Sequence, residues 1–266
     1  MKKKYIIKLL FITGLFFLYY LIMTSVFYQN FINKDANFFL LGGICRVIFM
    51  ILVIWLILKE KTIQTNYLFK NWIICILILI PIIYFSLSNT FKTFSELKLK
   101  GTNTKHSMYI FKNLSVGILE ELMSRVLIFS YSFKIFSNNQ KNAYKQFIFT
   151  SVSFGLIHLI NLASPGDVAL FGVFNQIFFA MIIGIIFQFL LLRLENIAFV
   201  ALIHFFIDYN SDKNSLFGIE RTQIIESGNV NYLALLILPS IFLFIVIPIT
   251  YFSLKNQEIK LIKSDN

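Results

Sequence analysis

Long runs of apolar residues, interrupted by short polar segments, dominate the pattern along the 266-residue chain. A helix needs about 20 mainly apolar residues to cross the roughly 30 Å of hydrocarbon in a bilayer. Strand-like alternation of apolar and polar residues is absent, which argues against a membrane barrel. The pattern therefore predicts an all-α, polytopic membrane helical bundle of about eight transmembrane helices. The predicted spans are residues 6–28, 38–58, 72–88, 112–137, 145–161, 168–192, 196–209 and 231–253.

Composition and charge support a membrane protein and narrow its partners. Of the residues, 58% are hydrophobic and only 14% are charged, with a mean hydropathy of +0.75, which excludes a soluble globular domain. The net charge is +11, but the chain holds neither a basic domain nor an aromatic nucleic-acid motif. We therefore expect no nucleic-acid partner and interpret the lysines as membrane-surface residues. The whole chain, 1–266, is predicted to be a single integral membrane domain.

The distribution of basic residues predicts the orientation. With the amino terminus inside, the inner segments carry twice as many lysines and arginines as the outer ones, which places both termini in the cytoplasm. The polar break at 89–111 disagrees with this orientation, because its four lysines would lie on the outer side of the membrane. It is expected to be a loop or an amphipathic interfacial segment. Abundant Lys, Asn, Ile and Phe suit a bacterial plasma membrane.

Three polar clusters lie inside the predicted spans. An ionised side chain at the bilayer centre costs roughly 2.5–3.5 kcal/mol, so such groups persist where they pair or do chemistry. The clusters are Glu120, Glu121 and Arg125 in the fourth span, Phe154 and His158 in the fifth, and His204 and Asp208 in the seventh.

The first cluster separates into a pair and a single carboxylate. Glu121 and Arg125 are i and i+4 on a helix, which predicts an ion pair on one face. Glu120 points about 100° away and is left as a candidate general base. The alternative is that all three residues only bind helices together.

Each histidine also has two interpretations. His158 is either a hydrogen-bond bridge between helices or a catalytic group. His204 and Asp208 share a helix face, and the Asp could orient the imidazole, ligate a metal or cap the helix end. Counting residues into each span places Glu120, His158, His204 and Asp208 at one level of the bilayer, which favours a shared site.

Other polar residues and the cysteines are assigned structural roles. Asn175 and Gln176 reach a similar depth, and helix-to-helix hydrogen bonding is their expected role. Cys45 and Cys75 differ in depth by about 15 Å, more than a disulfide tolerates. They are expected to be free packing residues.

The order Glu120-Glu121-x-x-x-Arg125, Phe154-x-x-x-His158 and His204-x-x-x-Asp208 resembles the CAAX-protease and bacteriocin-processing (CPBP, or Abi) family of intramembrane proteases. The resemblance covers about residues 112–211. Many members have an aromatic residue before the motif arginine and a glycine after it, where this chain has Ser124 and Val126. Asp208 stands where Asn is also common.

The resemblance implies peptide-bond hydrolysis of a peptide or membrane-protein substrate within the bilayer. Glu120 and His158 would activate water, while His204 and Asp208 would stabilise the oxyanion or hold a metal. Glu121 and Arg125 would be structural or substrate-orienting, with Phe154 in support. Zn²⁺ bound by Glu120, His158, His204 and Asp208 and a metal-free mechanism are the two alternatives for the chemistry.

Bacteriocin immunity, peptide processing and membrane-protein regulation are the roles associated with bacterial members of this family. A competing hypothesis from another class is a non-proteolytic immunity or scaffold protein that keeps the polar cluster for architecture. The sequence carries no signal for an oligomeric state.

Overall fold

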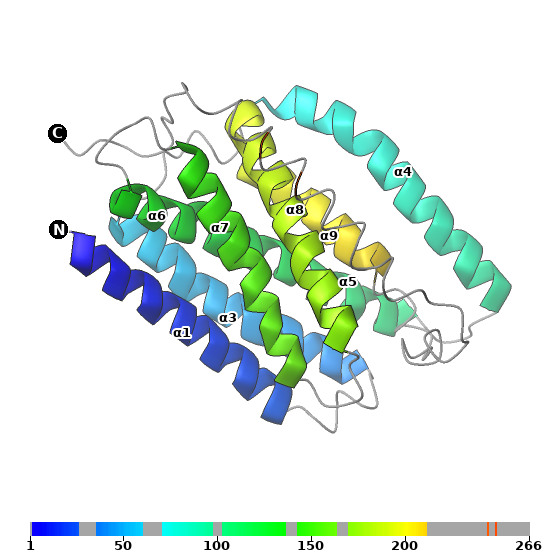
Figure 1. Cartoon of the computed structure of the whole chain (residues 1–266). Coiled ribbons are helices and arrows are strands. Elements are labelled where there is room, and N and C mark those ends of the chain that lie inside the picture. The colour runs from blue at the N-terminus through cyan, green and yellow to red at the C-terminus, as the bar shows by residue number, and fades with distance from the viewer. Residues whose placement is uncertain are drawn as a thin grey trace.

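The structure is a computed structural model that describes residues 2–26, 36–60, 71–97, 103–136, 143–163 and 170–211, with the single residues Phe244 and Pro248. This part of the chain is helical and contains no strand (Figure 1), which confirms the predicted all-α class. The elements are α1 Lys2–Val26, α3 Ala36–Glu60, α4 Trp72–Leu97, α5 Asn103–Glu121, the π-helical segment η2 Leu122–Ile128, α6 Phe129–Phe136, α7 Ala143–Ile157, the 3-10 helix η4 His158–Ala163, α8 Leu170–Leu194 and α9 Ile197–Ser211.

The predicted spans overlap these helices, except for the last span, 231–253, which lies outside the described residues apart from Phe244 and Pro248. Within the described residues, two stretches are long and apolar enough to cross a membrane, Leu40–Lys59 in α3 and Val173–Leu192 in α8. The predicted number of eight transmembrane helices therefore stays a prediction.

The polar break predicted at 89–111 is mostly helical, so its interpretation as a loop is wrong. Helix α4 continues to Leu97 and helix α5 begins at Asn103. Hydropathy marks where a helix leaves hydrocarbon, not where its backbone hydrogen bonds end. Residues 89–97 contain no glycine or proline, so nothing in their sequence stops the helix.

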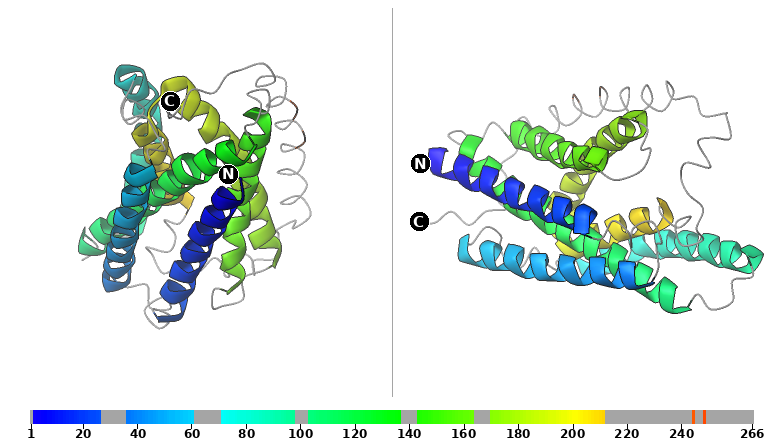
Figure 2. Two further views of the ribbon diagram at one scale, coloured as in Figure 1. Left: turned by 90° about the vertical axis from the view of Figure 1, so that its left-hand side faces the viewer. Right: turned by 90° about the horizontal axis from the view of Figure 1, so that it is seen from below.

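The segment formed by α5, η2 and α6 runs through the bundle and brings the other helices together (Figures 1 and 2). Helix α5 contacts α3 and α9, and η2 contacts α3 and α7. Helix α6 contacts α1 and α7, and α7 lies along α8. The junction between α5 and η2 is therefore surrounded by other helices, which is where the Glu120 cluster falls.

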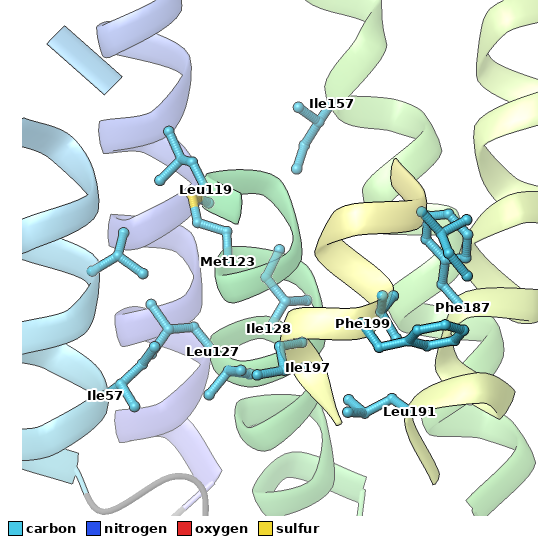
Figure 3. Close-up of a cluster of buried hydrophobic side chains, with 14 of the residues drawn as sticks. Ile57, Leu119, Met123, Leu127, Ile128, Ile157, Phe187, Leu191, Ile197 and Phe199 are labelled. Atoms are coloured by element: carbon cyan, nitrogen blue, oxygen red, sulfur yellow. The ribbon is translucent and has the colours of Figure 1, made fainter. Parts of the chain in front are cut away.

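Apolar side chains from α3, η2, α8 and α9 surround this junction (Figure 3). Burying each large aliphatic or aromatic side chain stabilises the bundle and fixes the rotation of η2 about its axis. The buried members of this cluster include Ile57, Met123, Leu127, Phe187, Leu191 and Phe199.

A tight turn at Glu195 and Asn196 sets the start of α9. Glu195 has a positive φ of 51°, and its N–H donates to the Leu191 carbonyl at 2.8 Å. The Asn196 Oδ1 accepts the Phe199 N–H at 2.9 Å, which caps the first turn of α9. This turn directs α9 back along α5.

Glycine allows α5 and α9 to approach closely. A Cβ on Gly117 would lie 2.8 Å from the Ala201 carbonyl oxygen and 3.0 Å from the Phe205 nitrogen. Both are backbone atoms of α9, which cannot rotate away as a side chain can. Because Gly117 has no side chain, α9 can lie close to the carboxylates of α5.

We predict that Gly117→Ala destabilises the protein by about 1–3 kcal/mol, because the added methyl overpacks the α5–α9 contact. Gly14→Ala in α1 is the matched control, since its Cβ would meet nothing within 4 Å. An alanine there should raise stability slightly, as it does in an open helix position. Thermal unfolding of the detergent-purified variants measures both effects, and equal midpoints would contradict the proposed close approach.

Candidate active site

Glu121 joins two helices through both oxygens of its carboxylate. Its Oε2 accepts a hydrogen bond from Arg125 Nε at 3.0 Å, as the i, i+4 spacing predicts. Its Oε1 accepts a second bond from His204 Nδ1 at 2.8 Å. Glu121 and Arg125 have no exposed side-chain surface. The carboxylate is therefore a buried bridge between the α5–η2 segment and α9.

His204 lies at the centre of the polar cluster. With its Nδ1 directed at Glu121, its Nε2 faces Glu120 Oε2 at 3.7 Å and Asp208 Oδ2 at 3.6 Å. The predicted pairing of His204 with Asp208 is confirmed. The sequence suggested that Glu120 is isolated, but in the structure the His204 ring lies beside its carboxylate. Three carboxylates thus surround one imidazole.

Phe154 connects the second histidine to this cluster. Its ring makes edge contacts with His158 and His204, with centroids 5.3 Å and 5.9 Å away. The Arg125 guanidinium lies over the same ring at 4.8 Å, a cation–π contact. The Phe154-x-x-x-His158 pattern therefore places one aromatic ring between two imidazoles.

The orientation of His158 follows from its backbone partner. Its Nδ1 lies 3.0 Å from the Phe154 carbonyl oxygen, which can only accept a hydrogen bond. Nδ1 must then carry the proton, and in the neutral ring Nε2 holds the lone pair. His158 is half-buried and begins η4, where α7 gives way to a 3-10 turn. The chain thus stays helical through residue 161, the end of the predicted span, but its last residues are 3-10 helical.

Two further residues at the site are not among the residues that the sequence predicts there. The Phe187 ring lies 5.7 Å from the His204 ring and 6.0 Å from the Arg125 guanidinium, so it contacts the same two groups as Phe154. Lys112 acts electrostatically on Asp208. A lysine inside a predicted span was a usable signal, whereas one phenylalanine among 32 offered none.

Beyond Asp208, aromatic residues link the ends of α5 and α9. His106 Nε2 lies 2.8 Å from the Tyr209 hydroxyl, and the Tyr109 hydroxyl donates to the Tyr209 carbonyl at 2.9 Å. Partial burial lowers the pKa of His106, which favours its neutral form at pH 7. These contacts hold α9 at the residue that directly follows Asp208.

The remaining sequence assignments concern structural residues. Gln176 Oε1 accepts a hydrogen bond from Asn161 Nδ2 at 2.8 Å, so its expected helix-to-helix role is confirmed. Cys45 and Cys75 are free thiols, also as expected.

The positions of the donor atoms determine whether a metal ion fits this cluster. Among the residues that the structure describes, no group of three or more His, Cys, Asp or Glu side chains is arranged to hold a metal ion. One nitrogen of each imidazole is engaged by Glu121 or by the Phe154 carbonyl. The side chains as placed do not form a ligand set, and the Zn²⁺ site stays a prediction.

We predict that Arg125→Met lowers the amount of folded protein, because it leaves the Glu121 carboxylate buried without its cation. Breaking one side of a buried pair costs on the order of 3–5 kcal/mol. Glu121→Gln should also be destabilising, whereas the double variant should be less damaged than Arg125→Met. Glu120→Gln is the matched control on the neighbouring residue. Fluorescence-detected size exclusion measures all four proteins.

Equal losses from Glu120→Gln and Glu121→Gln would contradict this division of roles. An additive double variant would show that the two side chains do not act as a pair.

Comparison with known proteins agrees with this geometry. Residues 102–210 match the family described as type II CAAX prenyl endopeptidase Rce1-like. No curated protein and no solved structure matches the chain significantly. The matched segment runs from α5 to α9 and contains every polar residue of the cluster. This segment therefore belongs to the CPBP family of CAAX-type proteases, which confirms the resemblance found in the sequence.

Proposed function

We propose that the chain is an intramembrane endopeptidase that cleaves a membrane-associated peptide or protein. The supporting observation is the position of Glu120, whose carboxylate lies 3.7 Å from His204 Nε2 beside the fully buried Glu121. The family to which residues 102–210 belong suggests CAAX-type endopeptidase activity and is membrane-embedded. Two carboxylates next to each other thus carry different tasks, one structural and one chemical.

In the proposed reaction Glu120 and His158 act on the attacking water. One of them takes a proton as the water oxygen bonds to the scissile carbonyl carbon, which converts the carbonyl oxygen to an oxyanion. The same proton then passes to the amide nitrogen as the carbon–nitrogen bond breaks. The second water proton stays with the new carboxylic acid or passes on to the amine, so the products account for both protons and no further reactant is consumed.

His204 is assigned to the oxyanion. As an imidazolium it donates Nδ1–H to Glu121 and presents Nε2–H to the developing negative charge. Asp208 orients the ring from the exposed side, with 27% of its own side chain accessible. Because an ionised Asp carries no donor, this chain would use His204 alone where Asn at the position of Asp208 could add an amide donor.

The proposed setting is the bacterial plasma membrane, with both termini cytoplasmic. Bacteriocin immunity, peptide processing or regulation of a membrane protein are the roles that such a peptidase would serve. A substrate would reach the cluster from the end of α9, where Asp208 is partly exposed.

We predict that Glu120→Gln abolishes cleavage while leaving the amount of protein unchanged, because it removes the proposed base and keeps the side-chain volume. Membrane peptides from wild-type and variant cells should be compared by mass spectrometry. A peptide or protein that accumulates uncut with Glu120→Gln identifies the substrate.

Glu195→Gln is the matched control, since it makes the same chemical change at the α8–α9 turn. Unchanged peptides and unchanged immunity in Glu120→Gln cells would instead support the non-proteolytic immunity or scaffold function.

The arrangement of donors also predicts how a chelator behaves. Because no three of the clustered side chains in the described residues are arranged to hold a metal ion, we expect cleavage by the purified protein to survive 1,10-phenanthroline. Loss of cleavage that added Zn²⁺ restores would overturn this expectation and support a metal held by Glu120, His158, His204 and Asp208. The metal content of the purified protein, measured before the chelator is added, tests the same question independently.

A further inference from the structure

Lysines and aromatic rings gather at the end of the bundle that carries the start of α1. Helix α6 ends there, beside the start of α1 (Figures 1 and 2). Helix α3 also ends there, and α7 begins there. We call this set of residues the basic rim. Its lysines are Lys3, Lys4 and Lys8 of α1, Lys59 of α3, Lys134 of α6 and Lys145 of α7.

Tyr5 is the centre of the basic rim. Lys8 Nζ of the same helix lies 6.0 Å from the Tyr5 ring centroid, and Lys134 Nζ of α6 lies 5.1 Å from it. The buried Tyr131 ring supports Tyr5 from within the bundle, with centroids 6.1 Å apart. Two ammonium groups from different helices thus lie beside one ring, and their positive charges attract an anion to it.

Neighbouring residues repeat the same chemistry. Lys59 Nζ lies 4.6 Å from the Trp55 ring centroid, and Lys145 Nζ lies 5.9 Å from that of Tyr144. Within the described residues, the acidic residues at these helix ends are Glu60 and Glu195, fewer than the lysines. Aromatic rings beside lysines are typical of the level at which a protein meets lipid headgroups.

Exposed apolar side chains continue from the basic rim along α1. They would lie against acyl chains when a headgroup is bound at Tyr5, an arrangement that free phosphate cannot use. These residues are Ile6, Ile7, Leu10 and Phe11, with exposed fractions of 42%, 57%, 66% and 63%.

We propose that the basic rim binds anionic phospholipids, with Tyr5, Lys8 and Lys134 holding the headgroup phosphate. Each lysine near an anionic surface adds to the attraction for lipid headgroups. The site joins α1 to α6, so a bound lipid stabilises the contact between these two helices. This inference does not depend on the proposed peptidase function.

The test uses the full chain purified in a neutral detergent. Dioctanoyl phosphatidylglycerol, dioctanoyl phosphatidylcholine and inorganic phosphate are titrated separately while the unfolding midpoint is followed by tryptophan fluorescence. The anionic lipid should raise the midpoint, and the other two should leave it near its starting value. Lys8→Gln with Lys134→Gln should weaken the response to the anionic lipid on the order of thirtyfold.

Lys112→Gln is the matched control because Lys112 Nζ lies 5.9 Å from the Tyr109 ring centroid in α5, outside the basic rim. It should keep the full lipid response. Equal stabilisation by inorganic phosphate, or an equal loss of response with Lys112→Gln, would overturn the proposal. If the double variant does not fold, Lys8→Gln alone decides, since an unchanged titration would contradict the role of the Tyr5 site.

Discussion

The geometry of the site depends on one buried carboxylate, that of Glu121. It accepts hydrogen bonds from Arg125 at 3.0 Å and from His204 at 2.8 Å, so it fixes the rotation of a π-helical segment and the orientation of an imidazole together. Burying a charge is costly unless it is paired and hydrogen-bonded, and both conditions are met here. The same carboxylate leaves only one nitrogen of His204 directed toward Glu120 and Asp208.

Aromatic side chains surround the bridge that Glu121 forms between Arg125 and His204. Phe154 and Phe187 contact both the Arg125 guanidinium and the His204 ring. They fill the space around the bridge with rings that offer no competing acceptor. Gly117 brings α9 close enough for His204 to reach Glu121. The chemistry of the cluster therefore rests on small and aromatic residues as much as on the charged ones.

The sequence predicted much of this arrangement because charged residues are costly to bury. Their presence inside apolar segments therefore indicates that they are paired or functional. The i, i+4 spacings of Glu121 with Arg125 and of His204 with Asp208 determine shared helix faces, and both pairs are found in contact. The bond from His204 to Glu121 joins residues 83 positions apart, and no local periodicity specifies such a partner. Likewise, hydropathy could not reveal that α4 continues to Leu97, since polar residues outside hydrocarbon remain compatible with a helix.

The π-helical segment Leu122–Ile128 constrains the number of residues that can connect α5 to α6. A π turn holds about one residue more than an α turn, so the segment shifts the rotational phase of α6 relative to α5. In a regular α-helix each residue advances the rotation by about 100°. Removing one residue from η2 would let α5 and α6 run on as a single α-helix, which rotates α6 relative to α5. If α5 then keeps its contacts with α3 and α9, α6 loses its contacts with α1 and α7. Single-residue deletions should therefore be far less tolerated here than substitutions, and the spacing between Glu121 and Tyr131 should be as invariant as the residues themselves.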